Sequence, residues 1–363
     1  MKDRAGNGIA VRRLRAQRLI GQASGDPVKV IHHLVAVQSQ DYPGGKWALA
    51  QRTSGGATDA QLDALFDAGA IVRTHVLRPT WHFVAPEDLR WLQALTGPRV
   101  QTGNGSRYRR LGIDAEVALR ARTVFERTLE GGRTATRDEL RDALVRGGID
   151  VDVARLTHLV MHAELEAAIC SGPRRGSRQT YMLVDERIPP SRPRERDEAL
   201  AELARRYVEG HGPAQVVDLV WWSGLTTADA RRGLEAAGDA LRREAVGERT
   251  LWVASSHGAA EPNTSVRLLP NYDELLVAFR DRSDAIDPEL PDPERVPEAI
   301  LAHVVVRNGL VVGAWRRRDG PRSLAVAIDL RVHLSPDERR LLATEVDRLG
   351  TFLGRTVEVA GLD

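Results

Sequence analysis

The chain has 363 residues, of which 28% are charged and 42% hydrophobic, and a formal net charge of +2; this composition predicts a buried core and excludes a disordered chain. The longest apolar stretches are far shorter than the roughly 20 residues of a membrane-spanning helix. The single cysteine, Cys170, excludes an intramolecular disulfide framework and a cysteine-based zinc cluster. The length suggests two or three domains.

A pattern of three helices followed by two extended segments begins near the N-terminus. Apolar spacing predicts helices at 27–37, 46–51 and 59–69, and extended segments at 71–77 and 80–84. The same order returns between residues 116 and 184, where Thr136-Arg137-Asp138-Glu139 is typical of a capping box at a helix start. Three helices followed by a basic hairpin are the outline of a winged helix-turn-helix.

The order occurs a third time after a Pro-rich linker, and the composition then changes. Helices are predicted at 197–210, 213–223 and 228–237, and strands at 241–246 and 249–254. From residue 266 the chain reads as β-rich, with a last helix at 335–349. We therefore predict an α+β protein with three tandem winged helix-turn-helix units (1–112, 113–190 and 191–262) and a C-terminal β-rich, barrel-like subdomain (263–363).

Winged helices are binding scaffolds, and the scaffold alone does not define a chemistry. One interpretation is a non-catalytic DNA-binding protein or transcription regulator, in which the third helix of a unit enters the major groove. A distinction between this and an enzyme has to come from particular residues.

Gln38-Ser39-Gln40-Asp41 is the most informative segment. Two glutamines two residues apart on a helix point about 200° away from each other, so they converge only where a helix ends. Pro43-Gly44-Gly45 predicts such an end nearby. Taken alone, Gln-x-Gln is a common pattern, and a solvated helix end is the favoured interpretation.

Five segments occur in a fixed order that resembles a known family. They are Gln38-Ser39-Gln40-Asp41, Trp47-Ala48-Leu49, residues 77–84 with Asp88, residues 212–225, and Leu268-Leu269-Pro270-Asn271-Tyr272-Asp273-Glu274. Together they resemble the AlkZ/YcaQ family of bacterial winged-helix DNA glycosylases, over residues 12–354. The resemblance implies tandem winged helices around a DNA-binding channel, and removal of alkylated bases from double-stranded DNA in repair or self-resistance.

The family motif places two polar residues around an aliphatic one, and it maps onto Gln38 and Gln40 as catalytic residues. Glutamine in the last place is similar to the AlkZ branch, which implies bulky adducts and interstrand crosslinks; the YcaQ branch has Asp there. Ser39 departs from the aliphatic pattern. The same resemblance implies that Arg78, Thr80 and His82 line the site.

Neutral glutamines suit a base that is already cationic. Alkylation at N7 or N3 of a purine makes the base a good leaving group, so no general acid is needed. The remaining task is to stabilise an oxocarbenium-like sugar and to place a water beside it. Amide oxygens can do both, which predicts hydrolysis by a monofunctional glycosylase.

Lys46 and Asp41 are the alternatives within this segment. Lys46 could form a Schiff base with the sugar and act as a lyase, but we favour a phosphate contact or a solvated side chain for it. Asp41 could be a general base, although its position on a helix would point it away from Gln40.

Two arginine clusters are candidate DNA contacts, and a solvated loop is the alternative for each. They are Arg174, Arg175 and Arg178 in the second hairpin, and Arg316, Arg317 and Arg318 further on. Such residues contact phosphates and give an affinity that falls with salt.

Metal and cofactor sites are not predicted. His158, His162 and Glu166 have a spacing that can present zinc ligands on one helix face, but a structural role on that face is favoured. The sequence has no P-loop and no Gly-x-Gly-x-x-Gly that opens a helix after a strand. We expect no cofactor, no membrane contact, no signal peptide and a monomer in the cytoplasm, associated with the nucleoid.

Overall fold

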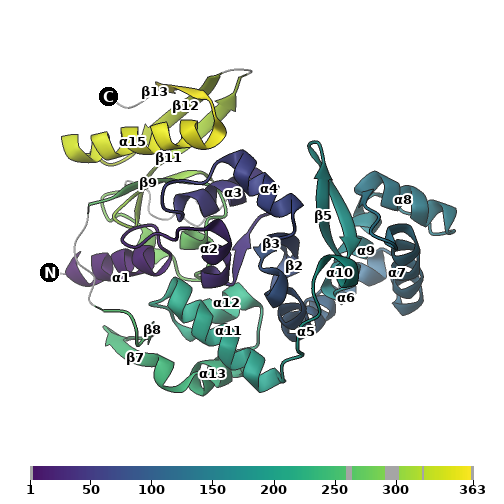
Figure 1. Cartoon of the computed structure of the whole chain (residues 1–363). Coiled ribbons are helices and arrows are strands. Elements are labelled where there is room, and N and C mark those ends of the chain that lie inside the picture. Colours follow the sequence, from purple (N-terminus) through teal and green to yellow (C-terminus); the bar gives the residue numbers. More distant parts are fainter. Residues whose placement is uncertain (1–2, 259–263, 291–301, 321–322, 361–363) are drawn as a thin grey trace.

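The computed structural model describes residues 3–258, 264–290, 302–320 and 323–360, and it has a mixed α+β fold (Figure 1). A helix, a strand, two helices and two antiparallel strands follow one another in two segments, which we call unit 1 and unit 2. Unit 1 consists of α2 (Pro27–Leu34), β1 (Ala36–Gln38), α3 (Tyr42–Gln51), α4 (Asp59–Asp67), β2 (Val72–Val76) and β3 (Arg78–Val84). Unit 2 consists of α7 (Ala115–Leu129), β4 (Ala135–Thr136), α8 (Arg137–Arg146), α9 (Val153–Leu165), β5 (Ile169–Arg175) and β6 (Arg178–Leu183). Their sheets have the same order, β1-β3-β2 and β4-β6-β5.

A third segment, unit 3, repeats this order with one difference. It consists of α11 (Arg196–His211), α12 (Val216–Ser223), α13 (Thr227–Ala236), β7 (Leu241–Val246) and β8 (Arg249–Ala254). An antiparallel bridge between Ala214 and Trp252 replaces the first strand. The elements predicted for the three copies therefore occur in the predicted order.

One predicted helix has the wrong C-terminal end, directly before Gln38. The helix expected at 27–37 ends at Leu34, Val35 adopts a left-handed φ of 68°, and the chain continues as strand β1. Val35-Ala36-Val37 continues the apolar spacing of the helix, but long-range pairing with β3 determines its conformation. The Pro-Gly-Gly segment begins α3 and does not end a helix.

The predicted capping box in unit 2 is confirmed. The Thr136 hydroxyl accepts a hydrogen bond from the Glu139 amide, and the Glu139 carboxylate accepts one from the Thr136 amide. Helices at both ends of unit 1 were not predicted: α1 (Asp3–Ala16), α5 (Pro86–Gly103) and α6 (Gly105–Arg110). The predicted boundary after residue 112 falls between α6 and α7, and the one after residue 190 follows α10 (Val184–Arg187). The boundary after residue 262 lies outside the described residues.

The C-terminal part is β-rich, as predicted, and its sheet is a curled half-barrel. Its strands are β9 (Val266–Leu269), β10 (Val304–Arg307), β11 (Leu310–Asp319), β12 (Ser323–Leu330) and β13 (Thr356–Ala360), in the order β13-β12-β11-β10-β9. The helix α15 (Pro336–Leu353) contacts this sheet and unit 1 (Figure 1). No described helix is long and apolar enough to cross a membrane.

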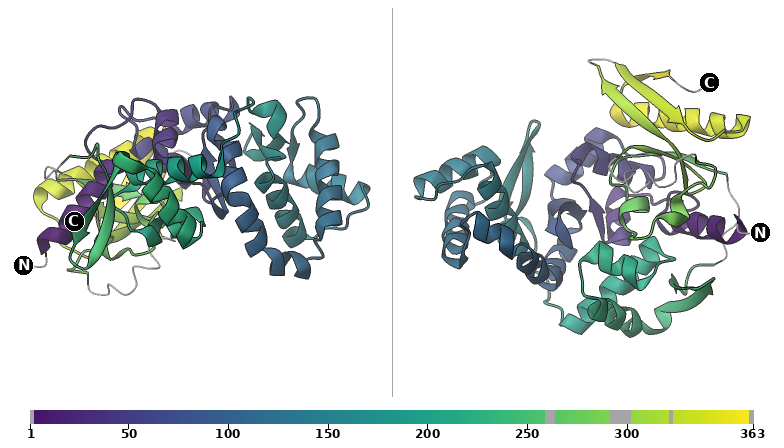
Figure 2. Two further views of the ribbon diagram at one scale, coloured as in Figure 1. Left: turned by 90° about the horizontal axis from the view of Figure 1, so that it is seen from below. Right: turned by 180° about the vertical axis from the view of Figure 1, so that it is seen from behind.

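Unit 1 lies between two hydrophobic cores, and unit 2 has its own. One face of the unit 1 sheet packs with unit 3 through residues such as Val84, Tyr207 and Trp222. The other face packs with the C-terminal sheet and α15 through residues such as Phe83 and Trp315. The core of unit 2 is separate, so this unit stands to one side of the molecule (Figure 2).

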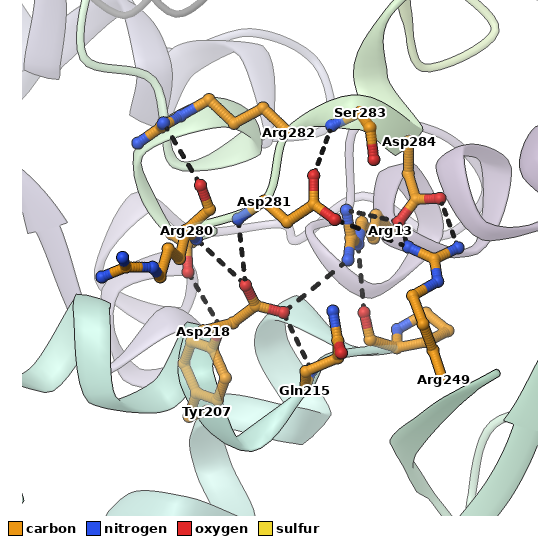
Figure 3. A network of polar contacts seen from close by, with 12 residues as sticks. Arg13, Tyr207, Gln215, Asp218, Arg249, Arg280, Asp281, Arg282, Ser283 and Asp284 are labelled. Carbon is orange, nitrogen blue, oxygen red and sulfur yellow. Dashed lines mark hydrogen bonds and ion pairs between the residues drawn. The ribbon is translucent and has the colours of Figure 1, made fainter. Parts of the chain in front are cut away.

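A buried ion network holds α1 against unit 3 (Figure 3). The Arg13 guanidinium is 2% exposed; Nε donates to the Pro213 carbonyl at 3.0 Å, and Nη1 and Nη2 lie 3.5 Å from Asp284 and 4.0 Å from Asp218. Arg249 binds Asp284 with two hydrogen bonds of 2.8 Å. A buried guanidinium needs such partners, because an unpaired charge is unfavourable away from water.

Unit 2 is held to unit 1 by an arginine of its hairpin. Arg174 binds Asp63 at 2.8 Å and Asp67 at 3.1 Å, and its backbone amide donates to Asp67 at 2.8 Å. Both aspartates belong to α4. The third helix of unit 1 therefore uses its acidic side chains to bind protein, and a second contact joins His75 of β2 to Glu164 of α9.

We expect Arg174→Ala to destabilise the protein by about 1–2 kcal/mol, because the side chain is partly shielded and Asp67 loses its partner. Urea unfolding and amide exchange of the β5–β6 hairpin would measure this. Arg178→Ala is the matched control: it lies on the same hairpin, exposed, and should change stability little. Equal effects of the two substitutions would contradict the role of Arg174.

Candidate active site

Gln38 is the last residue of β1, and its side chain is only 7% exposed. Across the strand pair it lies opposite His82. Alternate residues of a strand share a face, so the ladder rather than a helix end orients the Gln-Ser-Gln segment. Gln40 follows the strand in a bend and is exposed.

Two residues of opposite charge bind Gln38, one through its side chain and the other through its backbone. Arg78 Nη2 donates to Gln38 Oε1 at 3.0 Å, and the backbone amide of Gln38 donates to Glu274 Oε1 at 2.8 Å. Because a guanidinium only donates, it fixes the amide with its oxygen toward Arg78 and its NH₂ group away from it. The Gln38 side chain is thereby set in one orientation.

Glu274 is fully buried and uses both carboxylate oxygens. Its Oε2 accepts from Trp222 Nε1 at 3.0 Å and lies 3.4 Å from His211 Nε2. Burial alone would raise the pKa of Glu274, but its interactions with His211, His82 and the Gln38 amide outweigh this and hold the pKa below its usual value. A carboxylate is therefore present behind Gln38 at neutral pH.

His82 is neutral and presents an acceptor nitrogen. Its Nδ1 lies 3.0 Å from the Thr80 carbonyl, which only accepts, so Nδ1 carries the proton and Nε2 has the lone pair. Burial, together with the neighbouring Arg78, lowers the pKa of His82 to about 3. His82 is thus too weak a base to take a proton at physiological pH.

Buried polar atoms without a hydrogen-bond partner among the described residues occur on β3, which pairs with the Gln38 strand, and in two segments that contact this sheet or α3. They are Ser39 Oγ, Arg78 Nε, Thr80 Oγ1, His82 Nε2 and Asn271 Oδ1. Most buried polar groups in proteins are satisfied, so such a concentration indicates a place where polar groups of a substrate or water are bound. Ser39 also packs tightly: a Cβ on Gly45 of α3 would lie 3.2 Å from the Ser39 Cβ.

The structure brings Gln38, Arg78, Thr80 and His82 together, and it places Lys46 elsewhere. Lys46 is 5% exposed, and its Nζ lies 2.7 Å from both Asp59 and Asp63. This correction concerns all the sequence interpretations of Lys46, because a buried amine held by two carboxylates is not a solvated side chain and suits neither a phosphate contact nor a Schiff base.

The predicted DNA contacts differ in exposure. Arg174 is engaged with α4, as described above, and does not suit a phosphate contact. Arg175 binds Glu139 yet remains exposed, and Arg178 is exposed. On β11, Arg316 and Arg318 are exposed and share a face, whereas Arg317 alternates with them and is half-buried.

The histidines with metal-like spacing lie in unit 2. His158 contacts the Ala154 carbonyl at 2.8 Å, His162 lies 3.6 Å from Glu166, and both rings approach Tyr108. Among the described residues, no group of three or more His, Cys, Asp or Glu could hold a metal ion.

The contacts of Glu274 and Arg73 with the Gln38 segment are not evident from the sequence. The sequence favours a structural hydrogen-bonding pair over an acid/base couple for Asp273-Glu274; in the structure Asp273 binds Arg52 with two hydrogen bonds, and Glu274 binds the Gln38 amide. Arg73 donates twice to the Ser39 carbonyl and lies 4.4 Å from the Trp81 ring centre. Strand alternation over 72–84 could have indicated that Arg73 and Trp81 share a face, but not that they reach Ser39.

Comparison with known proteins gives two findings. The sequence matches the family model described as DNA glycosylase AlkZ-like over residues 31–352. Among solved structures, the DNA glycosylase AlkZ of Streptomyces sahachiroi has the same fold: the TM-score is 0.78 at 22% identity, with 98% of this chain and 99% of that chain covered. A comparison with curated protein sequences finds no match. Because the family model spans most of the sequence, the chain belongs to the AlkZ-like family of DNA glycosylases.

Proposed function

We propose that the protein is a monofunctional glycosylase that hydrolyses the N-glycosidic bond of alkylated bases in double-stranded DNA. Its substrates are cationic N7- or N3-alkylpurines, or related bulky or crosslinked adducts, in repair or self-resistance. The observation that carries the proposal is Gln38, held by Arg78 and Glu274, next to unpartnered buried nitrogens of Arg78 and His82.

The chemistry follows from groups that do not titrate near neutral pH. Arg78 occupies one lone pair of the Gln38 oxygen and leaves the second for a water. Gln40, exposed two residues further along the chain, would supply another amide to orient that water. The Glu274 carboxylate adds negative potential behind the site, where a low dielectric strengthens its effect on an oxocarbenium-like sugar. Neither His82 nor Glu274 carries a proton to give to the leaving base at neutral pH, so that base has to be activated by its own positive charge.

DNA binding in this proposal differs from that of a groove-reading regulator. We interpret units 1, 2 and 3 as winged helices, but the third helix of unit 1 carries three aspartates and no basic residue. The exposed arginines Arg178, Arg316 and Arg318 are better suited to contact phosphates. The protein would act as a monomer on DNA in the cytoplasm.

Gln38→Ala and Gln40→Ala should each reduce base release from a duplex with one N7-methylguanine by about a hundredfold, because each removes a group that positions water or stabilises charge. Release is measured by alkaline cleavage of the abasic product. Gln61→Ala, an exposed glutamine of the same unit, should keep full activity. Retained DNA affinity in the inactive variants would separate catalysis from binding.

Borohydride added during the reaction distinguishes hydrolysis from lyase chemistry. Because Lys46 is enclosed by Asp59 and Asp63, no protein–DNA adduct should be trapped. A trapped adduct would contradict the hydrolytic mechanism. If wild type releases no methylated base, crosslinked and bulky-adduct duplexes are the next substrates, and failure on all of them would favour a non-catalytic DNA-binding protein.

The single-turnover rate on a cationic base should be constant between about pH 5 and 7. His82 stays neutral throughout this range because its pKa is about 3, and Glu274 stays ionised because its pKa is lowered. Rapid-quench measurements at saturating enzyme would test this. A rate that rises through an inflection near pH 6 would show that a histidine acts as a base.

A further inference from the structure

Trp221 is exposed next to the candidate active site, although it belongs to an apolar helix. The sequence favours core packing for both Trp221 and Trp222, which is correct for Trp222 alone: Trp222 is 0% exposed and Trp221 is 37% exposed. The Trp221 indole is fixed by a 3.0 Å hydrogen bond from Nε1 to the Val277 carbonyl. The indole is thus held in place while part of the residue stays exposed.

Two guanidinium groups flank this ring from different parts of the chain. Arg78, which binds Gln38, lies 5.8 Å from the ring centre, and Arg282 lies 5.3 Å from it. Neither forms an ion pair within the described ranges, and Arg78 Nε and Arg282 Nη2 are buried without a hydrogen-bond partner. Burial lowers the pKa of both groups, and Arg78 lowers that of Arg282 further. Two like charges therefore stand close together with donors to spare.

The loop that carries Arg282 is anchored to the helix that carries Trp221. Asp218 of α12 accepts hydrogen bonds from the backbone amides of Arg280 and Asp281 at 3.0 and 3.4 Å. Figure 3 shows the side chains of Arg280 and Arg282 leaving this network on the same side. Arg282 Nε donates to the Leu276 carbonyl at 3.0 Å, which fixes the base of its guanidinium.

We propose that Arg78, Trp221 and Arg282 form a binding site for one phosphodiester group of the DNA strand, next to the nucleotide on which Gln38 acts. This inference rests on the proposed function and adds a contact between the active site and the backbone of the DNA strand. Paired guanidinium groups with free donors match the several acceptor oxygens of a phosphate, and the exposed indole offers a surface for the adjoining deoxyribose.

The geometry links this contact to the catalytic residue. Arg78 has five N–H donors, of which one binds Gln38 while Nε is free, so the same guanidinium can hold the Gln38 amide and a phosphate together. A pocket of about 670 Å³ is lined by Arg78 and Arg99, and by Arg196 paired with Asp229.

The test is binding to a duplex with a tetrahydrofuran abasic-site analogue, in which neutral methylphosphonates replace single phosphates near the analogue. In wild type, one position should weaken binding about tenfold, because a charge-assisted contact is lost. In Arg282→Gln, a methylphosphonate at that same position should not weaken binding further. The slope of log affinity against log salt concentration should fall by about one. Arg340→Gln, exposed on α15, is the control and should retain the full methylphosphonate effect.

Thermal unfolding of Arg282→Gln tests whether the substitution damages the fold. Arg282→Lys keeps the positive charge and should restore part of the salt dependence. Equal methylphosphonate effects in wild type and Arg282→Gln at every position would overturn the phosphate site. The two proposals can be contradicted independently. If the protein releases bases but Arg282→Gln keeps the full methylphosphonate effect, the phosphate site is wrong. If Arg282→Gln abolishes the methylphosphonate effect but no base is released from any substrate, the glycosylase assignment is wrong.

Discussion

The buried carboxylate of Glu274 connects unit 1 with unit 3. It binds the amide of Gln38 in unit 1, the indole of Trp222 in unit 3 and contacts His211 at the end of α11. A buried carboxylate without such donors would be several kcal/mol less favourable. The position of unit 3 relative to unit 1 is therefore fixed at the backbone of Gln38.

Other buried charges repeat this principle across long sequence separations. Arg52, directly after α3, binds Asp273, and Arg13 of α1 lies beside Asp218 and Asp284. Together with Gln38, three early segments are thus each paired with a late one. Removal of one partner from such a pair costs about 3–5 kcal/mol, because the other charge stays buried. Unit 2 has a core of its own, and it is joined to unit 1 by Cys170 in the shared core and by ion pairs such as Arg174–Asp63 and His75–Glu164. The molecule combines a centre connected by buried ion pairs with one arm that has its own core.

The sequence was sufficient for elements that local signals determine. The strands β7, β8 and β9 begin and end where they were predicted, and the Thr136 capping box is present. It was not sufficient for β1, whose three residues pair with β3 about 46 positions away and otherwise continue a helical spacing. Arg174 and Lys46 were assigned by charge alone, and only the fold reveals the aspartates that bind them. Gln38 was found through the family motif, while its partners Arg78 and Glu274 come from elements distant in sequence.

The exposed indole of Trp221 makes the intrinsic fluorescence of the protein sensitive to DNA binding. Of the seven tryptophans, five are buried and Trp81 is half-buried, so Trp221 alone faces solvent extensively. Indole emission depends on the polarity and charge around the ring, and Trp221 lies between two guanidinium groups. A change in intrinsic fluorescence when DNA is added would thus originate mainly at this position, and a Trp221→Phe variant gives its background. Occupancy of the site can be followed without attaching a dye to either molecule.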